Sequence, residues 1–256
     1  MNKIYFEYLW HIIRFFAFSL PVSFLNRTPG RHWAIIDLIK VAIEYEPMSA
    51  IPVVDLIDMY PSILEAPIIS SKPGHASAKS SEIMALASLA SSRKPKLIIE
   101  IGTQRGGTTL LLAQNAGFEA RTVTLDILSP GEYPYTGSAF RGTQWEGLIR
   151  FFQHDSRTFD WSPYLGKADF IYVDGCHDYE YVLADTKTAL SLRSPRGIIL
   201  WHDFPSANGV RRCLMELSRS QKGFYHVRGT RLALFDPHKA SLSVRPHWTL
   251  TGKDEA

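Results

Sequence analysis

Residues 97–109, LIIEIGTQRGGTT, join a short apolar run to a glycine-rich turn and to the start of a helical pattern. The run Leu97–Ile101 has the length and the β-branched composition of a strand that is buried on both faces. Glycines in the turn allow the backbone to approach a ligand closely, and the first turn of the next helix presents unpaired N–H groups to an anion. The spacing G-x-x-x-G-G is not the dinucleotide fingerprint G-x-G-x-x-G, which argues against an NAD-dependent dehydrogenase. This stretch therefore predicts a strand, a ligand-binding turn and a helix.

The same alternation of short apolar strands with helices continues beyond this stretch. Further strands are predicted at 122–125, 170–173, 198–201, 223–227 and 231–235, and helices at 108–115, 179–192 and 210–218. Strands that alternate with helices favour right-handed crossovers and a mainly parallel sheet with helices on both faces. The sequence therefore predicts an α/β domain over residues 82–236.

The segments on either side of this domain have a different character. Residues 1–66 show helical spacing and are predicted to form an N-terminal helical extension. A connector rich in Ser, Lys, Pro and Gly follows at 67–81, and residues 237–256 lack periodicity and are predicted to be a C-terminal tail.

The N-terminal helix carries a polar stripe on an otherwise apolar surface. The stripe consists of Lys3, Glu7, His11 and Arg14. The longest uncharged run, residues 15–26, is too short to span a membrane. We expect the helix to pack on its own domain or on a second subunit of a homo-oligomer, with peripheral membrane contact as the alternative.

The composition is that of an ordinary globular protein. Of the 256 residues, 45% are hydrophobic and 21% are charged, which excludes a disordered chain and a disulfide-rich miniprotein. The 28 basic and 25 acidic side chains leave a net charge of only +3, so no nucleic-acid partner is predicted. Cys176 and Cys213 have neither metal-type spacing nor the density of a secreted scaffold, which predicts a cytoplasmic protein.

Acidic residues follow the predicted strands at the edge of the sheet where ligands bind in such folds. Asp126 ends the second strand, about 20 residues beyond the glycine turn, where a carboxylate can accept both hydroxyl protons of a ribose. Asp155, in FFQHDS, could bond an adenine amino group, and a solvated loop carboxylate explains it about equally well. The ligand is therefore predicted to contain a nucleoside.

The segment 174–185, DGCHDYEYVLAD, is followed after the next strand by His202-Asp203. In these residues the chain resembles the class I S-adenosylmethionine-dependent methyltransferases, in the branch with D-G-x-H-x-Y-x-x-V-x-x-D and a later H-D pair. The turn E-x-G-x-x-x-G at residues 100–106 is similar to the cofactor loop of that family. The resemblance covers roughly residues 82–235 and implies a Rossmann-like, doubly wound sheet of seven strands, with S-adenosylmethionine as the cofactor.

The resemblance also implies a cofactor role for seven residues. They are Glu100, Gly102, Thr103, Gly106, Asp126, Asp155 and Ser156. The turn at Gly102 would hold the methionine part of the cofactor, with Glu100 near its ammonium group. Asp126 would bind the ribose, and Asp155 with Ser156 would bind the adenine edge.

A second group of residues matches catalytic and metal-binding positions of the family. Several members hold a divalent cation, Mg²⁺ or Mn²⁺, at the positions of Asp174, His202 and Asp203. His202 stands where the better-understood metal-binding members have a carboxylate, and an imidazole suits Mn²⁺, Fe²⁺ or Zn²⁺ better than Mg²⁺. His177 matches the general base of some members, and Asp174 can face the same cavity from three residues earlier.

These assignments predict an O-methyltransferase that acts on a hydroxyl of a small molecule or glycan. Methyl transfer to oxygen needs a hydroxyl that loses its proton close to the methyl carbon, which a histidine and a bound cation can promote. Two alternatives remain, a nucleotide-cofactor oxidoreductase and a non-catalytic cofactor-binding or assembly module. Neither alternative gives a catalytic role to the histidines and acids of residues 174–203.

Overall fold

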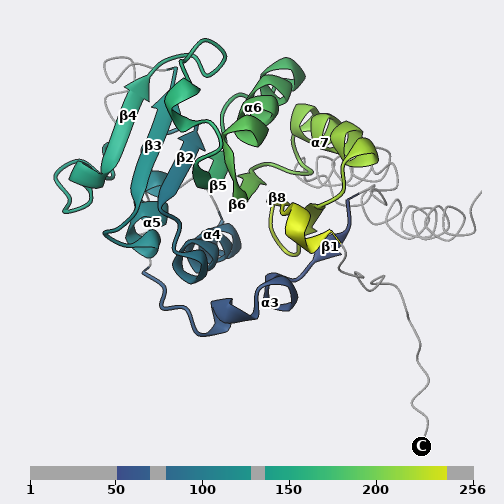
Figure 1. Ribbon diagram of the computed structural model, residues 1–256, viewed down its shortest axis with the longest axis horizontal. Coiled ribbons are helices and arrows are strands. Elements are labelled where there is room, and N and C mark those ends of the chain that lie inside the picture. The colour runs from purple at the N-terminus through teal and green to yellow at the C-terminus, as the bar shows by residue number, and fades with distance from the viewer. Residues whose placement is uncertain (1–50, 70–78, 128–135, 241–256) are drawn as a thin grey trace, which may run out of the picture. The chain divides into compact units, whose positions relative to one another are not determined.

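The structure is a computed structural model that describes residues 51–69, 79–127 and 136–240 (Figure 1). These residues belong to one compact unit of the chain, residues 49–256. The predictions for the N-terminal helix, for most of the connector and for the tail beyond residue 240 fall outside the described residues. Among the helices that are described, none is both long and apolar enough to cross a membrane.

A single eight-stranded sheet forms the centre of this unit (Figure 1). In chain order its strands are β1 (Val53–Val54), β2 (Leu97–Ile101), β3 (Arg121–Asp126), β4 (Ile149–Gln153), β5 (Ala168–Val173), β6 (Arg193–Trp201), β7 (Phe224–Val227) and β8 (Ala233–Phe235). In space the order is β1-β7-β8-β6-β5-β2-β3-β4. β8 pairs antiparallel with β6 and β7, and the other pairs are parallel. The predicted mainly parallel α/β sheet is confirmed.

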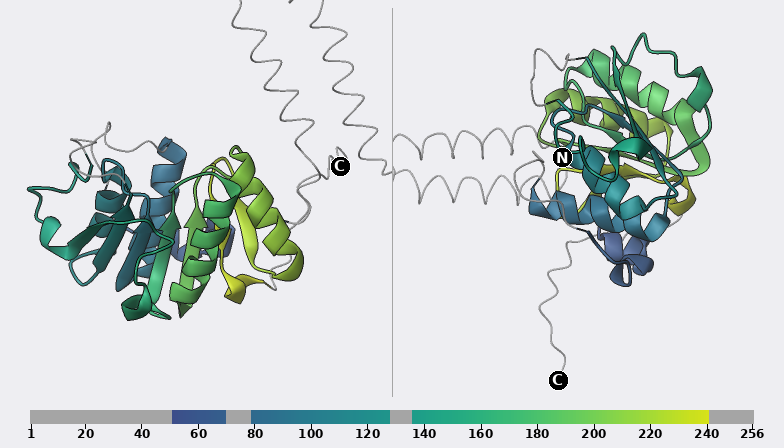
Figure 2. Two further views of the ribbon diagram at one scale, coloured as in Figure 1. Left: turned by 90° about the horizontal axis from the view of Figure 1, so that it is seen from above. Right: turned by 90° about the vertical axis from the view of Figure 1, so that its left-hand side faces the viewer.

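Helices cover both faces of the sheet (Figure 2). The four longer ones are α4 (Ser80–Arg93), α5 (Gly107–Ala116), α6 (Tyr179–Leu192) and α7 (Asn208–Ser220). α4 lies beside α5 on one face, and α6 lies beside α7 on the other. Because both faces are covered, consecutive strand residues such as Ile98 and Ile99 are both fully buried. This burial explains why the strands read as continuous apolar runs.

The sheet has one strand more than the predicted seven because residues 53–54 pair with β7. The spacing of residues 52–64 predicted a helix, but the structure has β1, a short helix α3 (Leu56–Met59) and a 3₁₀ turn η2 (Pro61–Leu64). Pro61 has no backbone N–H and restricts the residue before it, so a continuous helix cannot pass through this point. Through β1, this part of the predicted extension belongs to the sheet.

The segment after residue 135 packs against the glycine turn. The backbone N–H groups of Gly137 and Ala139 donate to the carbonyl oxygens of Gln104 and Arg105, at 2.8 and 3.0 Å. The ring of Phe140 is buried and stands where a Cβ atom on Gly106 would have to lie, 2.6 Å away. The turn is thus held in its shape by a segment more than thirty residues later in the chain.

Candidate active site

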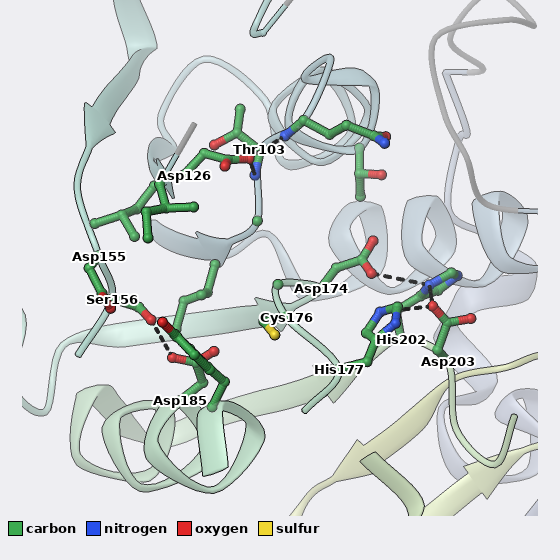
Figure 3. Close-up of a pocket in the computed structure, with 18 of the residues that line it drawn as sticks. Thr103, Asp126, Asp155, Ser156, Asp174, Cys176, His177, Asp185, His202 and Asp203 are labelled. Carbon is green, nitrogen blue, oxygen red and sulfur yellow. Dashed lines mark hydrogen bonds and ion pairs between the residues drawn. The ribbon is translucent and has the colours of Figure 1, made fainter. Parts of the chain in front are cut away.

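A cavity of about 620 Å³ opens at the carboxyl ends of β2, β3, β5 and β6 (Figure 3). This is the edge at which open α/β sheets bind their ligands. Nine residues with predicted site roles line it: Gly102, Thr103, Asp126, Asp155, Ser156, Asp174, His177, His202 and Asp203. Glu100 and Gly106 do not line the cavity. Side chains that are far apart in the sequence therefore meet around one hollow, as predicted.

The turn after β2 lies so close to the end of β5 that only glycine fits at its first position. Gly102 has a φ of +102°, and a Cβ atom there would lie 2.1 Å from the carbonyl oxygen of Asp174. The next two backbone N–H groups, of Thr103 and Gln104, donate to Oδ2 of Asp126 at 3.0 and 2.8 Å. Asp126 thus joins the end of β3 to the turn and stands at the cavity wall where a ribose was predicted.

Glu100 is placed differently from the expectation that it lies near the cofactor's ammonium group. Its side chain is fully buried and accepts hydrogen bonds from the hydroxyls of Thr109 and Thr124. The Thr124 hydroxyl is also 2.6 Å from that of Thr103 in the turn. Burial raises the pKa of Glu100 to about 8, against the effect of the two hydroxyl donors. Glu100 therefore supports the turn from behind and does not face the cavity.

Two aspartates, Asp155 and Asp185, lie at the predicted adenine edge, and their surroundings differ. Asp155 is paired with Arg157, whose Nη2 lies 2.8 Å from its Oδ2, and this hydrogen bond lowers the pKa of Asp155. Ser156 donates through its hydroxyl to Oδ1 of Asp185 on α6, at 2.6 Å. Asp185 is only 2% exposed, lines the cavity, and has a pKa that burial raises to about 6. It lies in the DGCHDYEYVLAD motif, but sequence reasoning gave it no role.

The opposite flank of the cavity holds a group of ionisable side chains that bond to one another (Figure 3). His177 Nε2 lies 3.1 Å from Oδ2 of Asp203. His202 Nδ1 lies 3.2 Å from Oδ1 of Asp174 and 3.2 Å from Oδ2 of Asp203. Gly209 at the start of α7 lies against the backbone of the His177 loop, because a Cβ atom there would lie 2.1 Å from the carbonyl oxygen of His177.

Two further members of this group were not found from the sequence. Glu82 in the first turn of α4 is fully buried, and its Oε2 lies 3.1 Å from Nε2 of His202. Arg231, just before β8, donates to Oε1 of Glu82 at 2.9 Å and to Oδ1 of Asp203 at 2.6 Å. We call Glu82, Asp174, His177, His202, Asp203 and Arg231 together the charged cluster. Their partners lie up to 149 residues apart, so no local motif signals them.

Three side chains of this cluster could hold a metal ion, and two of them belong to the predicted metal set. One ligand atom each from Asp174, His177 and Asp203 lies within 4.8 Å of the others, which is compatible with a shared cation. Both ring nitrogens of His202 lie close to carboxylates: Nε2 to Glu82, and Nδ1 to Asp174 and Asp203. Although burial lowers it, hydrogen bonds to Asp174 and Asp203 raise the pKa of His202 to about 10. Two of the three predicted ligands, Asp174 and Asp203, are thus grouped with His177, and the metal role of His202 stays a prediction.

Known proteins share this sequence pattern and this fold. A family model described as "Methyltransferase domain" matches residues 99–204, which carry most of the cavity wall. An O-methyltransferase from Bacillus cereus, solved with S-adenosylhomocysteine, is 20% identical, with 71% of this chain and 97% of that chain covered and a TM-score of 0.51. A protein from Corynebacterium glutamicum is 13% identical, with 78% and 95% covered and a TM-score of 0.51. Among curated protein sequences none matches the chain.

The family match and the fold agree with the cavity geometry. The match covers the glycine turn, the acidic strand ends and the His202-Asp203 pair, which were the residues that carried the resemblance. It favours methyl transfer over the oxidoreductase and the non-catalytic module. Residues 99–204 thus carry a methyltransferase domain, and the chain shares the fold of a solved O-methyltransferase.

Proposed function

We propose that this methyltransferase acts on a hydroxyl of a small molecule or glycan, with His177 as its general base. The observation that carries the proposal is the pair of His177 Nε2 and Asp203 Oδ2, 3.1 Å apart at the cavity wall. A carboxylate that accepts from one ring nitrogen fixes the tautomer and leaves the other nitrogen able to accept a proton. The similarly folded structure from Bacillus cereus is described as an O-methyltransferase, which supports oxygen as the acceptor atom.

Some residues around the cavity would bind the cofactor, and others would accept the proton of the hydroxyl. S-adenosylmethionine, when bound, supplies an electrophilic methyl group on its sulfonium sulfur. The turn at Gly102 would hold the methionine part of the cofactor and the carboxylate of Asp126 its ribose, so that the acceptor hydroxyl approaches from the charged cluster. As the carbon–oxygen bond forms and the carbon–sulfur bond breaks, His177 takes the hydroxyl proton through Nδ1. Asp203 keeps the ring in place and stabilises the imidazolium that results.

A divalent cation fits the same flank. Asp174, His177 and Asp203 would hold it, and the mixture of two carboxylates and one imidazole suits Mn²⁺ better than Mg²⁺. Such a cation would lower the pKa of the acceptor hydroxyl. In that case His177 would serve as a ligand, and the hydroxyl would need a different base.

The experiment compares wild type, His177→Gln and the matched control Glu180→Gln, an exposed residue of the same segment. Transfer of a labelled methyl group is measured on a panel of catechols and glycosides, with and without EDTA. We expect His177→Gln to lower kcat by about 10²–10⁴-fold while binding of S-adenosylhomocysteine stays within about twofold. Full activity of His177→Gln on every acceptor that wild type methylates would refute the proposal. Loss of wild-type activity in EDTA, with recovery in Mn²⁺, would assign His177 to the metal instead.

A further inference from the structure

The carboxylates of Asp155 and Asp185 lie near the predicted adenine edge. They differ in how many of their oxygens already accept hydrogen bonds from the protein. Both oxygens of Asp155 accept from Arg157: Oδ1 from its backbone N–H and Nε, at 2.9 and 3.2 Å, and Oδ2 from Nη2 at 2.8 Å. The Arg157 guanidinium in turn lies 3.8 Å from the ring centre of Tyr181 on α6. Asp155 is therefore engaged in holding its own loop against α6.

Asp185 has one oxygen in use and one that remains for a ligand. Oδ1 accepts from the Ser156 hydroxyl at 2.6 Å, whereas Oδ2 accepts no hydrogen bond from the described part of the chain. The side chain is 2% exposed and lines the cavity beside Gly175, where a Cβ atom would lie 3.6 Å from Oδ2. Because Asp185 lines the cavity, a ligand that brings a donor to Oδ2 would add a charge-assisted hydrogen bond there.

The position of Asp185 indicates which part of the cofactor brings that donor. Asp185 and Ser156 lie at the end of the cavity away from His177 and Asp203, with Asp126 on the same flank (Figure 3). If the ribose lies at Asp126 and the sulfonium faces the charged cluster, the base is the part left for this end. Ile127, 57% exposed at the cavity wall, offers an apolar surface to a planar ring. The exocyclic amino group is the hydrogen-bond donor that adenine carries.

We propose that Oδ2 of Asp185 accepts a hydrogen bond from the exocyclic amino group of the adenine, so that Asp185, and not Asp155, selects the base. Ser156 then acts as a positioning residue, because its hydroxyl fixes the other oxygen of the same carboxylate. The inference rests on S-adenosylmethionine as the cofactor but not on the nature of the methyl acceptor.

The test compares S-adenosylhomocysteine with S-inosylhomocysteine, in which a carbonyl acceptor replaces the amino donor, by calorimetric titration. We expect wild type to bind the adenine ligand at least about tenfold more tightly. In Asp185→Asn the side-chain amide can donate to the carbonyl, so this preference should fall by about tenfold or reverse. Asp155→Asn, the matched control, should keep the wild-type ratio, and Ser156→Ala should weaken both ligands.

Three results would overturn the inference: equal affinities in wild type, an unchanged ratio in Asp185→Asn, or a changed ratio in Asp155→Asn. The first needs no variant, so it decides the matter even if Asp185→Asn does not fold. S-adenosylhomocysteine binds without an acceptor, so these ratios stay measurable whether or not the enzyme methylates a hydroxyl. A failure of the proposed function is therefore distinguishable from a failure of this inference.

Discussion

The two flanks of the cavity hold their acids in different ways. On the nucleoside flank each carboxylate bonds to one nearby loop: Asp126 to two backbone N–H groups of the glycine turn, and Asp185 to the Ser156 hydroxyl. On the other flank, carboxylates, imidazoles and a guanidinium from α4, from the ends of β5 and β6 and from the segment before β8 bond to one another. Substitutions on the nucleoside flank should therefore act independently, whereas substitutions in the charged cluster should be strongly coupled.

The largest expected effect comes from breaking the charged cluster at its buried end. Glu82→Ala leaves Arg231 and His202 partly buried without their shared carboxylate, and it also removes the acceptor for the Lys79 N–H at the start of α4. We expect the free energy of unfolding to fall by about 3–5 kcal/mol, as is typical when one partner of a buried ion pair is removed. Urea denaturation followed by circular dichroism measures this loss.

The control for this prediction is Glu119→Ala, an exposed glutamate, which should change the free energy of unfolding by less than about 0.5 kcal/mol. A loss in Glu82→Ala no larger than that of the control would show that the cluster does not depend on its buried carboxylate. In that case the distinction between the two flanks would fail.

Glu100 provides a second test, in which the substitution should raise stability at high pH, because its buried carboxyl accepts from hydroxyls and is not paired with a cation. Its pKa in the fold, about 8, is above the ordinary value of 4.5, so the unfolded chain loses its proton first. Stability should therefore fall as pH rises from about 4.5 to about 8, and Glu100→Gln should remove this fall. At pH 9 we expect the variant to be more stable than wild type by roughly 2–4 kcal/mol.

Thermal unfolding of both proteins between pH 5 and pH 9 checks this prediction. If Glu100 instead contacts the cofactor's ammonium group, the amide variant should lose affinity for S-adenosylhomocysteine by about tenfold or more. Unchanged affinity together with a flatter pH profile would establish Glu100 as a support of the turn.

The difference between the flanks also explains what could be predicted from the sequence. The glycine turn, Asp126 and the strand pattern are local features, and buried parallel strands are readable as apolar runs. β4 was not predicted because its residues are only partly buried at the sheet edge, so it lacks such a run. Helix α6 was predicted with its observed bounds, because its apolar spacing and its neighbours agree.

Long-range partners set the limit of such prediction. Glu82 and Arg231 each stand in an ordinary local context, a helix start and a turn, and acquire their roles only where the fold brings α4 and β8 to His202. Glu100 was assigned to the ligand because its place in the motif suggested it, whereas the hydroxyls of Thr109 and Thr124 that donate to it show that it is turned inward. Side-chain direction within a buried strand end is decided by packing, which the motif alone does not contain.

The smallest of the expected effects concerns Asp126 and distinguishes its two possible contributions. Asp126→Ala should weaken binding of S-adenosylhomocysteine by about 10–100-fold, or about 1–3 kcal/mol, through the loss of charge-assisted hydrogen bonds. The 2′-deoxy analogue of the ligand, measured by the same calorimetric titration, should be affected less, because it lacks one of the hydroxyls that the carboxylate would bond. An equal loss for both ligands would mean that Asp126 acts only by holding the Thr103 and Gln104 amides. Combined with Glu82→Ala, its effect on the free energy of unfolding should add to within about 0.5 kcal/mol, because the two residues belong to different flanks of the cavity.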